Sequence, residues 1–322
     1  MRSILTFSFT ILCSSLMAQS FTGSQVREDL DYLIENIKTY NPALYIYNLD
    51  FDAQVADYIN GVTDKDASHF DVFKHTSRIA SMSNEGHFAL GNWSDEVHKG
   101  FQSNAFAYLP MAVEVINDKL FIKDLYAKSK LERADEIISI NGTSAADIIK
   151  MLYDHLPSDG HITTYKRGLV SSGFNWMYYL YVDRPDSYKI ETASGKSEII
   201  EAVTLQQMRD WVKENPLENV QPQYDFDVNT EVYATKIKEE TAILKMKSFN
   251  RGRIEKLGLK SNKFYKDFFK KLSEKAVKHL VVDLRGNRGG RNEFADDMLP
   301  YIIDEDDACF FKTTISWEGK ER

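Results

Sequence analysis

The sequence is poor in cysteine and has no cluster of positive charge, and each absence excludes a class of protein. Its 322 residues include only two cysteines, Cys13 and Cys309. Cys13 falls in a predicted signal peptide, so the mature chain keeps one cysteine and forms no intrachain disulfide. The net charge is -8, and the 40 basic residues are scattered along the chain. Because nucleic-acid binding needs clustered cations, we predict no nucleic-acid partner.

Long apolar runs are also missing, which predicts a protein with no membrane span. A helix that crosses a bilayer needs roughly 18 to 20 apolar residues, and the run ILTFSFTILCSSL is shorter than this. It follows Arg2 and precedes the small residue Ala18. A short positive start, an apolar run and a small residue are typical of a secretory signal peptide. We therefore expect residues 1–19 to be a signal peptide and the protein to be secreted or periplasmic.

No spacing of histidine, cysteine or acidic residues matches a known metal site. The H-E-x-x-H pattern and the paired cysteine and histidine spacings of zinc sites are absent. The acidic run at 304–307 lacks the alternation of a calcium-binding loop, and we interpret it as a solvated turn. Cys309 lies in the strand-like stretch ACFFKTTISW, where we expect a small hydrophobe. We predict no metal ion and no organic cofactor.

Residues 20–100 have the pattern of a helical region. Thr22 and Gln25 have the spacing of a helix cap, and apolar residues then recur at helical intervals until Pro42 stops them. A second helix is expected over about 70–82. The region ends in the stretch NEGHFAL, in which His87 directly follows Gly86.

Residues 101–200 have the pattern of a β-rich module. Short strands are expected at MAVEVI, KLFIKDLY and DEIISING, and a helix is expected from Ser144 to Leu152. This order is typical of a small, partly open barrel.

Residues 201–322 begin an α/β arrangement, so the whole chain is predicted to be a multidomain α/β protein. TAILKMKSF alternates apolar residues with lysines, as in a strand with one wet face, and Phe264, Phe268 and Leu272 then form a helical stripe. The apolar run LVVDL predicts a strand buried on both faces of a partly parallel sheet. Asn292 is expected to cap the next helix. Strand, helix and strand in this order indicate a β-α-β crossover.

A glycine-rich turn, RGNRGG, follows that strand and raises the question of which anion it holds. Gly286, Gly289 and Gly290 free backbone N–H groups at the start of a helix, where anions are favoured. The phosphate-binding patterns G-x-x-x-x-G-K-[ST] and G-x-G-x-x-G are both absent, which disfavours a nucleotide. Two interpretations remain open: an oxyanion hole for acyl transfer, or a tight turn that needs positive φ and binds nothing.

The stretch VKHLVVDLRGNRGG resembles the signature of the tail-specific, or C-terminal processing, serine peptidases of family S41. Four further stretches agree in order with that family: NEGHFAL, LERADEIISINGTSAADIIKML, LPSDGHITTYKRGLV and AILKMKSFNR. The resemblance implies a PDZ-like module that receives a peptide and an α/β core, with a crotonase-like sheet, that cleaves it. On this basis DEIISING either binds a peptide at an exposed sheet edge or only packs in the sheet.

The resemblance also implies roles for three residues. The backbone N–H groups of Gly289 and Gly290 correspond to the oxyanion hole, and His87 corresponds to the base of the tricorn-like branch. A serine hydroxyl is a poor nucleophile until a neighbour with a near-neutral pKa removes its proton. The tricorn-like branch has a serine directly before this histidine, where this chain has Gly86. The other branch uses a serine and lysine dyad without a histidine.

The nucleophile of the family has no clear counterpart in the sequence. In the family this serine begins a helix several tens of residues after the glycine turn. Ser316 is the sole serine after Gly290, and it lies in a strand-like stretch. We therefore expect 201–322 to be the first part of the core, and the 322-residue chain to be an inactive secreted serine-type peptidase of this family.

The alternative is a non-catalytic, secreted peptide-binding protein on the same scaffold. For both interpretations the expected partner is a peptide or an unfolded protein. The incomplete sheet is expected to leave a strand edge unpaired, and such edges recruit other strands. A homo-oligomer is therefore also expected.

Overall fold

The computed structural model describes residues 20–62, 67–88, 104–216 and 225–303, and the backbone of 316–317 and 320–321. The predicted signal peptide, Cys309 and the acidic run at 304–307 lie outside the described residues. The chain divides into two units, Met1–Glu218 and Asn219–Arg322, and each is described by itself. Among the helices described, none combines the length and the apolar character that crossing a membrane requires.

The first unit begins with helices that pack their apolar faces together. The predicted cap is confirmed: Thr22 and Gln25 form a capping box at the start of the first helix. Ser68 and Asp71 cap the fourth helix in the same way. The elements of this layer are β1 (Ser20–Phe21), α1 (Gly23–Tyr40), α2 (Leu44–Tyr47), α3 (Phe51–Gly61), β2 (Ala67–Ser68) and α4 (His69–Ser81). Leu30, Phe51 and Ile79 are fully buried where these helices meet.

An antiparallel sheet with the order β4-β5-β6-β8-β9 forms the rest of this unit. The predicted strands and the helix after them are confirmed. These are β4 (Met111–Ile116), β5 (Lys119–Leu125), β6 (Glu136–Ile140) and α6 (Ala145–Tyr153). The other elements here are β7 (Thr143–Ser144), α7 (Thr164–Tyr181), β8 (Ser187–Thr192) and β9 (Ser197–Glu201). Side chains from α6, α7 and the sheet share one buried cluster around Ile140, Phe174 and Tyr188.

The position of β6 in this sheet favours packing over peptide binding, the two interpretations of DEIISING that the sequence left open. DEIISING forms β6, which pairs with β5 on one side and with β8 on the other. A strand that is paired on both sides has no free edge, so a peptide cannot add to it. The edge strands of the described sheet are β4 and β9. The free edge of β4 is partly covered by α7, because Ser171 of that helix accepts a hydrogen bond from the Val115 N–H at 3.0 Å.

Residues 203–214 also pack in the first unit. β10 (Val203–Thr204) pairs with β3 (Ala107–Tyr108), and α8 (Leu205–Glu214) follows directly, capped by Thr204. Met208 of this helix is buried against Tyr108 and Tyr179.

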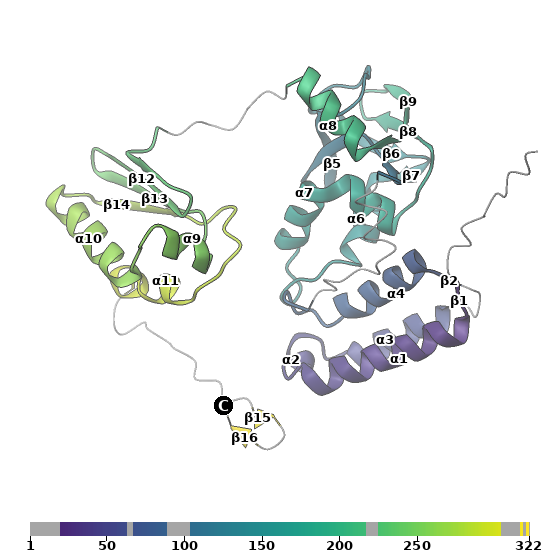
Figure 1. Ribbon diagram of the computed structural model, residues 1–322, viewed down its shortest axis with the longest axis horizontal. Coiled ribbons are helices and arrows are strands. Elements are labelled where there is room, and N and C mark those ends of the chain that lie inside the picture. The colour runs from purple at the N-terminus through teal and green to yellow at the C-terminus, as the bar shows by residue number, and fades with distance from the viewer. Residues whose placement is uncertain are drawn as a thin grey trace, which may run out of the picture. The chain divides into compact units, whose positions relative to one another are not determined.

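The second unit is a four-stranded sheet with α10 across one face (Figure 1). Its elements are β11 (Val228–Asn229), β12 (Tyr233–Lys238), β13 (Thr241–Met246), α9 (Arg251–Lys256), α10 (Ser261–Glu274), β14 (His279–Asp283), α11 (Glu293–Asp296) and the 3-10 turn η1 (Leu299–Tyr301). β13 and β14 pair in parallel, which confirms the predicted crossover. Leu244, Phe268 and Leu272 are buried between sheet and helix, as their spacing predicted. Farther along, β15 (Ser316–Trp317) pairs with β16 (Lys320–Glu321).

Two expectations about this unit are wrong. LVVDL was expected to be buried on both faces, but β14 is an edge strand and Val281 is 49% exposed. Asn292 was expected to cap a long helix, but its side chain makes no cap hydrogen bond and α11 has only four residues. The chain then forms a 3-10 turn at Pro300, because proline cannot supply the N–H that an α-helix would need.

The exposed edge of β14 predicts self-association of the 322-residue polypeptide. Beside it, a cavity of about 630 Å³ is lined by apolar side chains that include Ile243, Val281 and Leu284. An unpaired apolar edge recruits a second strand, and a lysine on such an edge opposes pairing. We expect Val281→Lys to raise the dimer dissociation constant about tenfold, as measured by sedimentation equilibrium, which corresponds to about 1.4 kcal/mol.

Ile116→Lys is the matched control, because Ile116 is also 49% exposed but lies on β4, whose edge α7 covers. It should leave the dissociation constant unchanged. A wild-type polypeptide that stays monomeric at every concentration would contradict the prediction.

Candidate functional site

The residue before the glycine turn's first exposed residues is Asp283, whose carboxylate is fixed by hydrogen bonds and by nearby cations. Asp283 ends β14, and its side chain is only 8% exposed. It accepts hydrogen bonds from the backbone N–H of Arg285 at 3.0 Å and from the guanidinium of Arg285 at 2.9 Å. Lys245 on the paired strand lies 3.4 Å away. These bonds hold the pKa of Asp283 well below its usual range.

The glycines of the turn are required for two different reasons. Gly286 and Gly289 have φ of 81° and 80°, a left-handed conformation that glycine adopts without strain. Gly290 is required mainly by close approach: a Cβ atom there would lie 2.0 Å from the backbone oxygen of Phe249. No side chain can be added at Gly290 unless the backbone moves.

Backbone hydrogen bonds tie this turn to the segment after β13. The Phe249 N–H donates to the Gly289 oxygen at 3.1 Å, and the Arg291 N–H donates to the Phe249 oxygen at 2.8 Å. Asn287 adds a side-chain bond to the Met246 oxygen at 3.1 Å. The turn is therefore fixed at the carboxyl end of the parallel pair β13 and β14.

The two predicted oxyanion donors differ in their present partners. The Gly289 N–H donates to the side-chain oxygen of Asn287 at 2.8 Å. The Gly290 N–H has no acceptor within the described part of the chain. A free, rigidly held N–H is the kind of group that stabilises a developing negative charge.

His87 lies in an exposed loop that two carboxylates organise. Its ring Nδ1 is 3.2 Å from Glu85, which also accepts a bond from the His87 backbone N–H at 3.0 Å. The Gly86 N–H donates to Asp159 at 2.7 Å, and the Gly160 N–H donates to the Asn84 oxygen at 2.8 Å. The His87 side chain is 94% exposed, so it is open to a substrate.

The same contacts explain why this chain has a glycine before the histidine. A Cβ atom at Gly86 would lie 2.7 Å from the Asp159 carboxylate. A serine at this position would displace Asp159. Glu85, His87 and Asp159 also offer ligand atoms within 4.8 Å of one another. Hydrogen bonds account for this grouping, so we assign no metal site to it.

The predicted site residues lie in different units. His87 is in the first unit, and Gly289 and Gly290 are in the second. Ser316 is in β15, of which only the backbone is described.

A family model identifies the segment that carries the glycine turn. Residues 240–314 match the model of peptidase family S41. This segment of the chain is therefore similar to peptidase family S41. The matched segment contains β13, both helices of the crossover, β14 and the turn, so it includes Gly289 and Gly290 but not His87. No curated protein matches the sequence.

One solved structure agrees at the level of the fold, with a TM-score just above 0.5. The crystal structure of mature CPAF matches 84% of this chain with a TM-score of 0.51 and 14% identity. The photosystem II D1 C-terminal processing protease matches 86% of it with a TM-score of 0.32 and 10% identity. This chain covers 56% of the CPAF chain, so it spans just over half the length of that protein.

Ser77 and His155 have the residue types of a hydrolase site, but both are buried. Ser77 Oγ lies 3.1 Å from His155 Nδ1, and Tyr181 stacks on the histidine ring. Ser77 and His155 are 5% and 8% exposed. Burial lowers the pKa of His155 to about 3, which makes it a weak base. We assign this pair to packing of α4 against α7.

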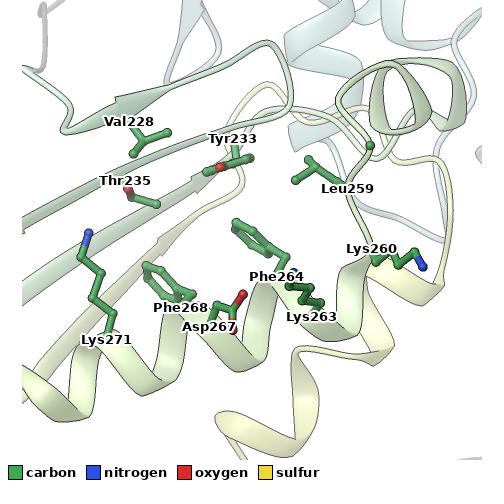
Figure 2. Close-up of a pocket in the computed structure, with 11 residues that line it drawn as sticks. Val228, Tyr233, Thr235, Leu259, Lys260, Lys263, Phe264, Asp267, Phe268 and Lys271 are labelled. Carbon is green, nitrogen blue, oxygen red and sulfur yellow. The ribbon is translucent and has the colours of Figure 1, made fainter.

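An apolar groove lies between β12 and α10 (Figure 2). It has a volume of about 540 Å³, and Tyr233, Phe264 and Phe268 line it together with lysines of the helix. The rings of Tyr233 and Phe264 are 4.6 Å apart. None of the predicted site residues lines this groove, so we do not place the chemistry of the S41 family there.

The loop of His87 should loosen when Asp159 loses its carboxylate. Asp159→Ala removes the acceptor of the Gly86 N–H, and a hydrogen bond to a charged group contributes about 1.5 to 3 kcal/mol. We expect the amide hydrogen of Gly86 to exchange at least about tenfold faster, as measured by NMR. Asp159→Asn keeps an oxygen acceptor and should retain most of the protection. Equal rates in all three proteins would contradict this role.

Asp283 should make the second unit more stable at neutral than at acidic pH. Its pKa is lowered in the folded state, so its contribution is present above its unfolded pKa, about 4, and is lost as the pH falls through the folded value. We expect Asp283→Asn to cost about 2 kcal/mol at pH 7, and the difference from wild type to shrink below pH 4, about the unfolded pKa.

Hydrogen–deuterium exchange of peptides from β13 and β14, in a urea series, measures this local stability. Asp267→Asn is the control, because Asp267 is exposed on α10. A difference that stays constant from pH 7 to pH 3 would show that the charge of Asp283 is not its source.

Proposed function

We propose that this chain supplies the peptide-holding and oxyanion-stabilising parts of a serine-type peptidase that cleaves unfolded or C-terminal protein segments. The observation that carries the proposal is the glycine turn. It lies inside the S41 match, it is fixed by backbone bonds to Phe249, and it presents the Gly290 N–H without an acceptor among the described residues. Removing one oxyanion donor from a hydrolase typically lowers kcat by about 10² to 10³-fold, so such a donor accounts for a large part of the catalysis.

His87 is proposed as the general base of this peptidase. Its Nδ1 donates to Glu85, which leaves Nε2 as the acceptor for a serine proton. The carboxylate also stabilises the imidazolium that forms when the proton is taken up. High exposure of the ring is compatible with a partner that approaches only in the substrate complex.

The nucleophilic serine is proposed to lie outside the described residues. Among the described serines, the one that contacts a histidine ring is Ser77, which is buried. Ser316 is the sole serine of this sequence after Gly290, and it lies in the short strand β15. On this ground we propose that a polypeptide of these 322 residues does not hydrolyse peptides. Export by the predicted signal peptide of 1–19 would place the peptidase among secreted or periplasmic proteins.

The sheet of the first unit is proposed to hold the peptide in the manner of a PDZ-like module. β9 is an edge strand, and Ile199 on it is 65% exposed. An extended peptide can add to such an edge through backbone hydrogen bonds. We therefore propose β9, and not β6, as the strand to which the peptide adds.

One observation favours a second function, a peptide-binding protein without catalysis. Asn287 occupies the Gly289 N–H, so one of the two proposed oxyanion donors is already satisfied inside the turn. A turn that has lost its catalytic role needs no free donors.

Labelling with a fluorophosphonate separates the two functions. We expect the protein purified from the cells that make it to be labelled at one serine and to cleave casein, and we expect the polypeptide of 322 residues to do neither. Mass spectrometry of the labelled peptide locates the serine. Label on a serine among 20–303 would overturn the assignment of the nucleophile, and a natural protein that is neither labelled nor active would establish the binding protein instead.

A further inference from the structure

A cavity of about 660 Å³ lies against the glycine turn, and positive charge dominates its lining. Among the residues that the structure describes, five cations and no carboxylate line it; the cations are Lys247, Arg251, Arg253, Arg288 and Arg291. The volume is in the range of ordinary ligand sites, about 300 to 1,000 Å³. The chain as a whole has a net charge of -8, so this concentration of cations runs against its composition.

Two of the cations are neutralised by nearby acids. Arg251 pairs with Glu255 at 2.7 Å, and Arg291 pairs with Glu293 at 3.0 Å. Both carboxylates lie outside the lining of the cavity.

The other three cations have no carboxylate partner in the ranges that the structure describes. Lys247 donates to the side chain of Asn229 and to the Thr230 oxygen, which are neutral. The guanidinium groups of Arg253 and Arg288 make no hydrogen bond or ion pair with a described residue. Burial, followed by repulsion from Lys245, lowers the pKa of Lys247. An anion in the cavity would relieve that repulsion and satisfy both guanidinium groups.

The position of the cavity indicates what the anion belongs to. Gly289 and Gly290 line it together with the cations. If the carbonyl of a cleaved bond sits at the Gly290 N–H, residues within about two or three positions of it reach the cavity, because an extended chain advances roughly 3.3 to 3.6 Å per residue. Guanidinium groups bind carboxylates through paired, charge-assisted hydrogen bonds.

We propose that this cavity binds acidic side chains of the substrate peptide, so that the protein selects segments with aspartate or glutamate close to the bond at the glycine turn. The inference rests on the proposed function for the location of the substrate. The cavity lies entirely in the second unit, and its recognition is distinct from strand addition at β9 in the first unit.

Binding of defined peptides to the 322-residue protein tests the proposal. The probes are fluorescein-labelled peptides with blocked ends that carry either four glutamates or four glutamines at the same positions, measured by fluorescence anisotropy. We expect the glutamate peptide to bind at least about tenfold more tightly, with the ratio falling as salt is added. A third peptide, with glutamines and a free carboxyl end, should bind like the blocked glutamine peptide.

Matched variants assign the binding to the cavity. Arg253→Gln and Arg288→Gln together should remove most of the preference for glutamate, and both side chains are exposed, so the fold should tolerate the changes. Arg209→Gln, an exposed arginine on α8, removes the same kind of charge elsewhere and should have no effect.

Several outcomes would overturn the proposal. These are equal affinity for glutamate and glutamine peptides, an equal loss in the Arg209→Gln control, or tight binding of the peptide with the free carboxyl end. Binding of inorganic phosphate that depends on Arg253 and Arg288, without binding of either blocked peptide, would assign the cavity to phosphate instead. The measurement involves no cleavage, so its result is independent of whether the natural protein reacts with a fluorophosphonate.

Discussion

The close approach of Gly290 to the backbone of Phe249 is the constraint on which the second unit depends. It extends the parallel pairing of β13 and β14 past the ends of both strands, because Phe249 bonds to the residues on either side of Gly290. A side chain at Gly290 would meet the Phe249 oxygen at 2.0 Å and separate the two segments. The Gly290 N–H, the basic cavity and the start of α11 all take their positions from this contact.

The elements that the sequence predicts well are those whose signals are local. The cap of α1 requires only Thr22 and Gln25, three residues apart, and the structure contains that capping box. β13 shows its buried face as the alternation of Ala242, Leu244 and Met246, all fully buried. The pairing of Asp283 with Arg285 is also local. In each case the partners are close enough in sequence for spacing alone to determine the contact.

Predictions fail where the environment of a strand depends on segments that are far away in the sequence. The run LVVDL has the composition of a doubly covered strand, but composition cannot specify what lies on each face, and Val281 is half exposed. β6 has the pattern of a peptide-binding strand, yet β8, about fifty residues later, pairs with its second edge. The short α11 is a different case, because Pro300 was visible in the sequence and predicts the end of a helix.

The basic cavity illustrates why scattered charge in a sequence does not exclude concentrated charge in a fold. Arg253 lies in α9 and Arg288 follows β14, so α10 and β14 separate them in sequence, and the bonds between Phe249 and the glycine turn bring them to one cavity. At physiological salt the screening length is about 8 Å, so an acidic side chain in this cavity interacts mainly with nearby cations. The net charge of -8 opposes the approach of an acidic peptide only weakly, because the second unit, Asn219–Arg322, has 20 basic and 18 acidic residues. Local geometry therefore determines which peptides this surface selects, and the same backbone contact that requires Gly290 produces it.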